Sequence, residues 1–275
     1  MVEIPSFAAI FGRRRPLIGV IHLPPLPGSP RSRGDLKALG DRVRQDARAL
    51  AAGGASGMLL ENFGDAPFLA EHVPPATVAM MTALALIARE AAALPLGVNV
   101  LRNDAAAALA VALAGGGAFI RVNVHVGAAV TDQGLLQGRA AATLRLREQL
   151  GVGIAVFADV GVKHAAPLAA RPLAEEAEEA VHRGLADALI VTGPATGRPA
   201  AAGDLAAVRC ALPDTPLLAG SGVNPQNVGE VLRHADGLIV GTALKRDGRV
   251  EAPIDEQAVR ALVAAIAAAP ALPAP

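Results

Sequence analysis

The sequence has few of the residues that often mark the class of a protein. Its 275 residues include no Trp and no Tyr, and Cys210 is the only cysteine. A single cysteine excludes an intramolecular disulfide and a zinc site built from cysteines. We expect Cys210 to lie on a helix as a buried structural thiol. Ala, Val, Leu and Gly must then form most of the core, as is typical of helices that pack closely on a parallel sheet.

The chain also lacks an excess of positive or negative charge, and it has no long hydrophobic run. The chain has 25 basic and 25 acidic residues, and no basic stripe is interleaved with aromatic residues, so we expect no nucleic-acid partner. No apolar run approaches the roughly 18 residues that cross a bilayer. The start, MVEIPSFAAIFGRRRP, places a short apolar stretch before its basic run, unlike a signal peptide. We therefore predict a cytoplasmic protein with no integral membrane segment.

Short apolar runs alternate with helical patterns about eight times, which indicates repeated βα units. The length suits one (β/α)₈ barrel, a TIM barrel, which needs roughly 250 residues. We predict a single domain over 1–275, with the barrel at about 15–268 and a Pro-rich tail. An open, doubly wound sheet is the alternative. The expected strands are 17–23, 57–62, 96–101, 118–124, 153–159, 188–193, 216–220 and 237–241. The expected helices are 35–52, 76–93, 104–114, 135–150, 172–184, 203–211, 225–234 and 255–268.

Two glycine-containing turns follow the last two expected strands. The segments are AGSGVNPQNV at 219–228 and GLIVGTALK at 237–245. Glycines let backbone N–H groups approach an anion, and in barrels the loops after strands seven and eight commonly bind phosphate. Either turn alone has a simpler explanation, because βα turns often need glycine. Together they predict a phosphate site at Gly220, Ser221, Gly222, Gly241 and Thr242. Lys245 either adds positive charge there or lies in solvent.

Polar residues stand at most of the expected strand ends, where barrel enzymes carry their active sites. Arg121, Asn123 and His125 occupy alternate positions, so they should share one face while Val122 and Val124 face the helices. Buried Arg121 and Asn123 would need partners, and Glu61 and Asp159 are the natural ones. Rim hydrogen bonds and helix caps are the alternative explanation for any one of these residues.

We expect Asp159, Glu61 and His125 to form the catalytic group, with the two carboxylates leading as acid and base. The expected substrate contacts are His22, Asn62, Asn99, Arg121, Asn123, Lys163 and Thr192. The loop HLPPLPGSPR at 22–31 is stiffened by prolines and is expected to form a wall of the site. We predict no cofactor. A divalent metal held by His22, Glu61, His125 and Asp159 is a weaker alternative, as is a Schiff-base lysine.

Several segments together resemble one known family. They are PLIGVIHLPPLPGSPR, ENFGDAPF at 61–68, RVNVHVG at 121–127, DVGVKHA at 159–165, AGSGVNPQNV and GLIVGTALKRDG. The chain is identified by them as similar to the BtpA family, which also includes SgcQ-type proteins, from about residue 15 to 265. The resemblance implies a ribulose-phosphate-binding type of barrel. It implies no established reaction.

Two functions are therefore open. The first is an enzyme that isomerises, epimerises or cleaves a phosphorylated sugar or sugar-like metabolite, including glycosyl-bond cleavage. The second, implied by the resemblance, is a non-catalytic photosystem I biogenesis factor. The ionisable residues at the strand ends favour the enzyme. The partner that we expect is a phosphorylated small molecule, with a homo-oligomer left open.

Overall fold

Eight parallel strands close into a barrel in the computed structural model of the protein, which describes residues 2–162, 165–169, 171–193 and 197–270. Around the barrel the strands follow in the order β1 (Leu17–His22), β2 (Gly57–Glu61), β3 (Leu96–Asn99), β4 (Phe119–Val122), β7 (Ala155–Val160), β9 (Ala188–Thr192), β10 (Leu217–Gly220) and β11 (Gly237–Val240). Pairing of Leu17 with Leu238 joins the first strand to the last. The predicted TIM barrel is confirmed, and the open sheet is wrong.

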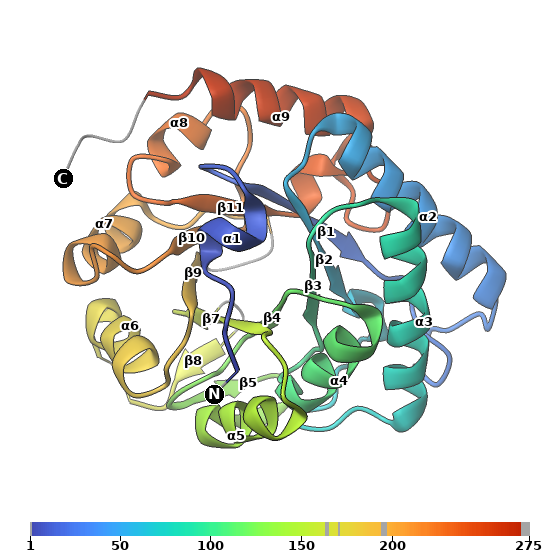
Figure 1. Ribbon diagram of the computed structural model, residues 1–275, viewed down its shortest axis with the longest axis horizontal. Helices are drawn as coiled ribbons and strands as arrows, with labels where there is room; N and C mark the ends of the chain where they lie inside the picture. Colours follow the sequence, from blue (N-terminus) through green and yellow to red (C-terminus); the bar gives the residue numbers. More distant parts are fainter. Residues whose placement is uncertain (1, 163–164, 170, 194–196, 271–275) are drawn as a thin grey trace.

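Helices form a ring outside the strands (Figure 1). They are α2 (Leu36–Gly53), α3 (Pro75–Ala91), α4 (Ala105–Gly115), α5 (Ala140–Leu150), α6 (Leu173–His182), α7 (Ala202–Ala211), α8 (Val228–Val231) and α9 (Glu256–Ala268). Short 3₁₀ turns follow β2 and β11, namely η1 (Phe63–Asp65), η2 (Thr242–Leu244) and η3 (Arg246–Gly248). The helix expected over 225–234 is only one turn long, because α8 spans Val228–Val231.

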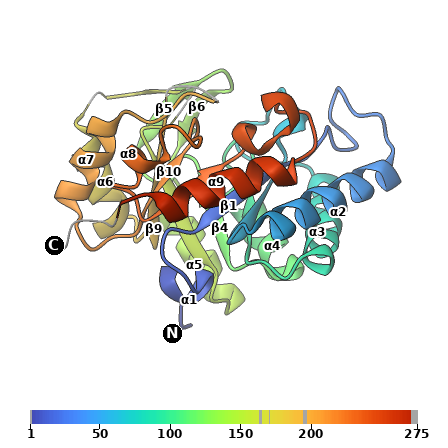
Figure 2. The same ribbon diagram turned by 90° about the horizontal axis from the view of Figure 1, so that it is seen from above.

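A small antiparallel sheet interrupts the repeating pattern after β4. Strands β5 (Ala128–Thr131) and β6 (Gly134–Gln137) form a hairpin, and β8 (Ala165–Pro167) pairs with the other side of β5. The hairpin occupies the first residues of the helix expected over 135–150, so that prediction is wrong before Ala140. Figure 2 shows β5 and β6 at the end of the barrel opposite to the chain's N-terminus.

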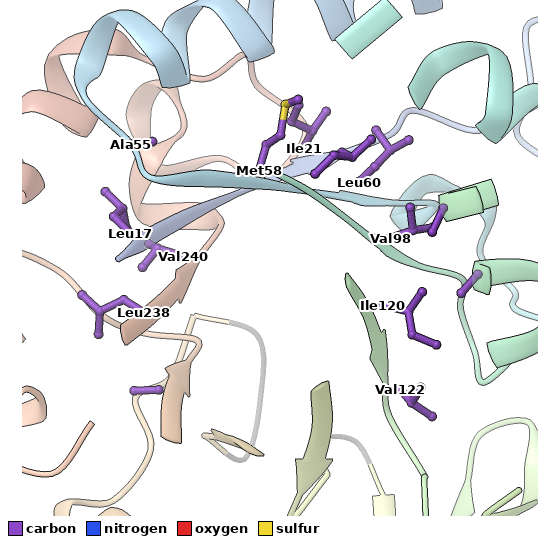
Figure 3. Packing of buried hydrophobic residues seen from close by; sticks show 14 of the residues in the cluster. Leu17, Ile21, Ala55, Met58, Leu60, Val98, Ile120, Val122, Leu238 and Val240 are labelled. Carbon is purple, nitrogen blue, oxygen red and sulfur yellow. The ribbon is translucent and has the colours of Figure 1, made fainter. Parts of the chain in front are cut away.

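Alternation along the strands creates two apolar layers. Leu17, Ile21, Met58 and Leu60 point outward to the helices, as Figure 3 shows. Their neighbours, including Ile18, Val20 and Leu59, fill the barrel interior instead. The interior is thus a packed core and not a channel, and polar groups can collect only at the strand ends.

The N-terminal end of the barrel is closed by α1 (Phe7–Phe11), an element that the sequence patterns did not predict. The Phe11 ring lies 5.8 Å from Phe119, and Phe119 stacks on Phe157 at 4.5 Å. Because Phe119 begins its strand, this aromatic cluster fills the end of the barrel remote from the loops after the strands. Figure 2 shows α1 there. Within the described residues, the helices are all too short or too polar to cross a membrane.

Two expectations about burial are wrong. Cys210 lies on α7 as predicted, but its side chain is exposed. Lys245 is neither in solvent nor directed at the phosphate loops, because its side chain is fully buried against Asp46 of α2. The Lys245 Nζ atom is 3.4 Å from Asp46 Oδ2.

Asp46 joins α2 to the segment that follows β11. Its carboxylate accepts hydrogen bonds from Arg42 Nε at 3.0 Å and from the Ile254 amide at 2.8 Å, besides the contact with Lys245. Burial lowers the pKa of Lys245 to about 8, against the opposing attraction of Asp46. Since the lysine loses its charge more readily in the folded chain than in the unfolded chain, burying the ammonium group costs stability below pH 8.

We predict that this cost disappears between pH 8 and 10.5. Over that range the unfolded chain binds more protons than the folded chain, so the free energy of unfolding rises with pH. A pKa of about 8 against 10.5 corresponds to about 3 kcal/mol. Urea unfolding should therefore show wild type gaining about this much relative to Lys245→Met across the range. The exposed Lys37→Met is the control and should follow wild type. Equal pH slopes for wild type and Lys245→Met would contradict the prediction.

Candidate functional site

A cavity of about 170 Å³ opens at the C-terminal ends of the strands. One side is formed by the loops after β10 and β11, with Ser221, Gly222, Asn224 and Thr242. The other side carries His22, Glu61 and Arg121 from β1, β2 and β4. The predicted phosphate loops and part of the predicted polar group therefore share one cavity.

The two phosphate-loop candidates present backbone donors to this cavity. Ser221 and Gly222 both have positive φ, at 74° and 64°, which turns the chain sharply after β10 and suits glycine at the second position. Among the described residues, the amides of Gly222, Val223, Thr242 and Ala243 have no hydrogen-bond acceptor. Unpaired amides that line a cavity are the groups that anions bind.

Close packing explains both glycines. A Cβ on Gly222 would lie 2.1 Å from the Pro199 nitrogen, so the loop after β9 rests directly on this residue. A Cβ on Gly241 would lie 2.5 Å from Cε1 of His22. The loop after β11 is thus in contact with the imidazole, and the expected phosphate site lies beside the ionisable residues.

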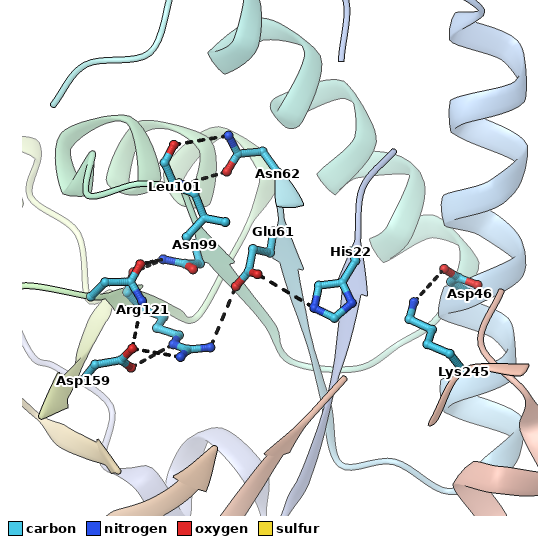
Figure 4. Close-up of polar contacts among 10 residues, drawn as sticks. His22, Asp46, Glu61, Asn62, Asn99, Leu101, Arg121, Asp159 and Lys245 are labelled. Carbon is cyan, nitrogen blue, oxygen red and sulfur yellow. Dashed lines mark hydrogen bonds and ion pairs between the residues drawn. The ribbon is translucent and has the colours of Figure 1, made fainter. Parts of the chain in front are cut away.

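A buried ion pair crosses from β4 to β7 within the barrel mouth (Figure 4). Arg121 donates from Nε to Asp159 Oδ1 and from Nη2 to Asp159 Oδ2, both at 2.9 Å. Asn123 donates to the same Oδ2 at 2.8 Å. Burial opposes the charge of Arg121, but Asp159 and then Glu61 outweigh it and raise the pKa of the guanidinium. The guanidinium of Arg121 therefore remains charged.

Glu61 stands between Arg121 and His22 without a hydrogen bond to either. Its Oε2 lies 3.8 Å from Arg121 Nη1, and its Oε1 lies 3.8 Å from His22 Nε2. Both distances exceed hydrogen-bond length. The His22 ring also packs on Phe63 with the ring centres 4.7 Å apart. Glu61 therefore lines the cavity with neither carboxylate oxygen hydrogen-bonded to these two neighbours.

The predicted orientation of β4 is confirmed at four positions. Arg121 and Asn123 point inward to Asp159, whereas Val122 belongs to the outer apolar layer and Val124 to a small cluster under the hairpin. Figure 3 shows Val122 directed away from the barrel interior.

The same prediction is wrong for His125. Strand β4 ends at Val122, and the alternation continues only as far as Val124. The His125 Nε2 atom bonds to the Gly184 carbonyl oxygen at 2.8 Å, between α6 and β9, and burial lowers the pKa of the imidazole. A neutral ring donates this bond from Nε2. The expected four-residue metal set is therefore not assembled, and the described residues contain no other group of three or more metal-binding side chains.

Asn62 and Asn99, two expected substrate contacts, hydrogen-bond mainly to the protein, whereas Oγ1 of Thr192 has no partner among the described residues. Asn62 accepts from the Leu101 amide at 2.7 Å and donates to Asp65, bracing two loops. Asn99 donates to the Arg121 carbonyl at 2.9 Å, and its Oδ1 has no partner among the described residues. Thr192 is buried at the end of β9. Lys163 lies outside the described residues.

Arg102 was missed by the sequence reasoning, although it interacts electrostatically with Asp159 and Glu61. It is buried just after β3, and burial lowers its pKa while Asp159, Asp132 and Glu61 act in the opposite direction. Arg102 directly follows the expected strand 96–101, and polar residues at the ends of expected strands are the site candidates, so its position in the sequence already pointed to the barrel mouth.

The proline-rich loop after β1 does not form the expected wall. Its Leu26 amide donates to Asp65 Oδ1 at 2.7 Å, and the Gly64 amide donates to the Leu23 carbonyl at 2.9 Å. The loop is thereby tied to the turn after β2. From this loop only His22 is among the described residues that line the cavity.

Residues 13–268 match the model of the BtpA family. The chain belongs to the BtpA family. It is 45% identical over 94% of its length to the photosystem I biogenesis protein BtpA of a Synechocystis strain, covering 90% of that protein. An uncharacterized Thermococcus kodakarensis protein is also 45% identical, over 91% of this chain and 94% of its own. A Caenorhabditis elegans relative called mitochondrial is 34% identical, over 93% and 94% of the two chains.

Solved structures of the same fold are more distant from this BtpA-family chain in sequence. Thiamine phosphate pyrophosphorylase of Pyrococcus furiosus is 18% identical with a TM-score of 0.55, covering 94% of this chain and 97% of its own. N-(5'-phosphoribosyl)anthranilate isomerase of the same organism is 14% identical with a TM-score of 0.54, covering 92% and 99%. At these identities the likeness establishes the barrel fold.

We predict that Asp159→Asn destabilises the protein by about 3 kcal/mol, because it leaves a buried guanidinium with Glu61 as its remaining counter-ion. The double variant Arg121→Met/Asp159→Asn should lose clearly less than the sum of the single variants. Urea unfolding measures both effects. Glu256→Gln removes the exposed pair with Arg260 and should cost less than about 0.5 kcal/mol. Additive losses in the double variant would refute the pairing.

Proposed function

We propose that the protein is an enzyme that moves a proton on a small phosphorylated molecule, such as a sugar phosphate. The phosphate group is bound by the amides of Gly222, Val223, Thr242 and Ala243, and the reacting carbon faces Glu61 and His22. The observation that carries the proposal is the shared cavity, in which unpaired backbone donors lie opposite a carboxylate and an imidazole.

The size of the cavity supports a small substrate. At about 170 Å³ it is below the roughly 300–1,000 Å³ of pockets that bind drug-sized ligands. The contact between Gly241 and His22 supports a phosphate site next to the proposed acid–base groups. A substrate that reaches both sites therefore has few atoms between its phosphate and its reacting carbon.

Glu61 is assigned the proton transfer in preference to Asp159. Both oxygens of Asp159 already accept hydrogen bonds, from Arg121 and Asn123, and its carboxylate is fully buried. Glu61 lines the cavity, with both oxygens beyond hydrogen-bond distance of Arg121 Nη1 and His22 Nε2. Asp159 is then a positioning residue that orients Arg121, as Asn123 is through the same carboxylate.

This division of roles favours one class of reaction. A base beside the buried cations Arg121 and Arg102 suits removal of a proton next to a carbonyl group, because the cations stabilise the negative charge that develops on oxygen. Isomerases, epimerases and lyases share this step. Glycosyl-bond cleavage usually needs two carboxylates that reach the substrate, and Asp159 does not face the cavity.

A second candidate function is photosystem I biogenesis, because the Synechocystis relative carries that name. Relatives in Thermococcus kodakarensis and Caenorhabditis elegans, with 45% and 34% identity over nearly the whole chain, do not carry that name. The cavity that combines unpaired backbone amides with Glu61 favours binding of a small metabolite over this second candidate.

We predict that phosphorylated sugars raise the melting temperature, whereas the same sugars without phosphate do not. A ligand at 100 times its Kd adds about 2.7 kcal/mol of stability. Gly222→Ala should bind the best ligand roughly 5–100 times more weakly, because it strains a positive φ and strikes Pro199. Gly229→Ala, at a glycine with open space around it, is the matched control.

Glu61→Gln separates binding from catalysis. It should keep the thermal response to the phosphorylated ligand but lose turnover by about 10²–10⁴-fold. Equal stabilisation by sugars with and without phosphate would contradict the phosphate site. Turnover of Glu61→Gln within a few-fold of wild type would contradict the assignment of the base.

A further inference from the structure

A second cavity lies on the other side of β4, outside the barrel. It measures about 260 Å³, more than the cavity in the mouth. Its floor consists of the outward-facing Val122 and Val124 together with Leu136 from the β5–β6 hairpin, and all three are buried. Ala106 of α4 and Ala142 of α5 stand at its sides. One wall thus comes from a hairpin that the eight βα units do not require.

The polar and charged side chains at the rim of this cavity already have partners in the protein. Arg139 Nη2 lies 2.7 Å from Glu71 Oε1, and Asp104 accepts hydrogen bonds from the amides of Val73 and Ala107, both at 2.9 Å. Asn103 is occupied as well, since it exchanges hydrogen bonds with both backbone groups of Val124 at 2.8 and 2.9 Å. An ionic ligand would have to compete with these contacts.

We propose that this second cavity is a binding site for a neutral, largely hydrocarbon molecule the size of one or two six-membered rings. An engineered cavity of about 150 Å³ accepts benzene, and pockets for drug-sized ligands begin at roughly 300 Å³. A cavity of about 260 Å³ falls between these sizes. The apolar floor and the rim groups that already have protein partners select against charged molecules, so this ligand differs in class from the phosphorylated substrate.

Binding of a ligand at this site alters the mouth of the barrel, because the two cavities share β4 and the two residues that follow it. Val122 and Val124 line the second cavity, whereas the intervening Asn123 and the preceding Arg121 hold Asp159. Asn103 clamps Val124, and its neighbour Arg102 is buried beside the same ion pair. A ligand that pushes on the two valines therefore displaces the side chains that orient the site.

Indole is a suitable probe, because the chain has no Trp and no Tyr to obscure its fluorescence. We expect saturable binding of one indole per chain, with emission shifted to shorter wavelength. Ala142→Phe places a ring at the side of the cavity and should weaken binding at least tenfold. Ala141→Phe, on an equally exposed neighbouring residue outside the lining, should bind within twofold of wild type. The ¹⁵Nε–¹Hε NMR signal of Arg121 should shift in the complex.

Three results would overturn the proposal. Indole that does not saturate, or that binds Ala142→Phe as it binds wild type, would show that the cavity is not the site. An Arg121 signal unchanged in the complex would refute the coupling through β4. Conversion of a dimer to a monomer by Ala142→Phe, seen in sedimentation velocity, would mean that a second copy of the chain occupies the cavity.

Discussion

The arrangement of the mouth depends on the need of a buried guanidinium for a counter-ion. Arg121 is almost completely excluded from solvent, and an isolated charge in that position would cost several kcal/mol. Asp159 meets this need with two parallel hydrogen bonds from the neighbouring strand. The pair uses both oxygens of one carboxylate and leaves Glu61 facing the cavity. Which carboxylate is open to the cavity is thus decided by which one the arginine holds.

Strand β4 connects this ion pair to the rest of the molecule. Along β4, the side chains of alternate residues point inward to the mouth and outward to the apolar layer beneath α4 and α5. The alternation continues to Val124, two residues beyond the end of β4, and the chain then turns into the hairpin. His125 follows that turn and binds Gly184, between α6 and β9. A four-residue strand and the two residues after it therefore separate the polar mouth from a second cavity.

The barrel and most of its strand ends were predictable, because short apolar runs and polar residues at their ends depend on local spacing. The pairing of Arg121 with Asp159 was also within reach, since a buried charge demands a partner. Three features were not. The position of His125 depends on where β4 stops, and an alternating pattern cannot give that. The burial of Lys245 depends on Asp46, which lies 199 positions away along the chain. The closing helix α1 depends on contacts of Phe11 with two distant strands.

The most direct test of the account is the structure of the protein crystallised with inorganic phosphate at a concentration that saturates its thermal response. The account predicts a phosphate within hydrogen-bond distance of the amides of Gly222 and Thr242, with the Arg121–Asp159 pair intact. It also predicts that Glu61 remains open to the cavity. A phosphate bound instead to Arg121, with Asp159 displaced from the guanidinium, would contradict it.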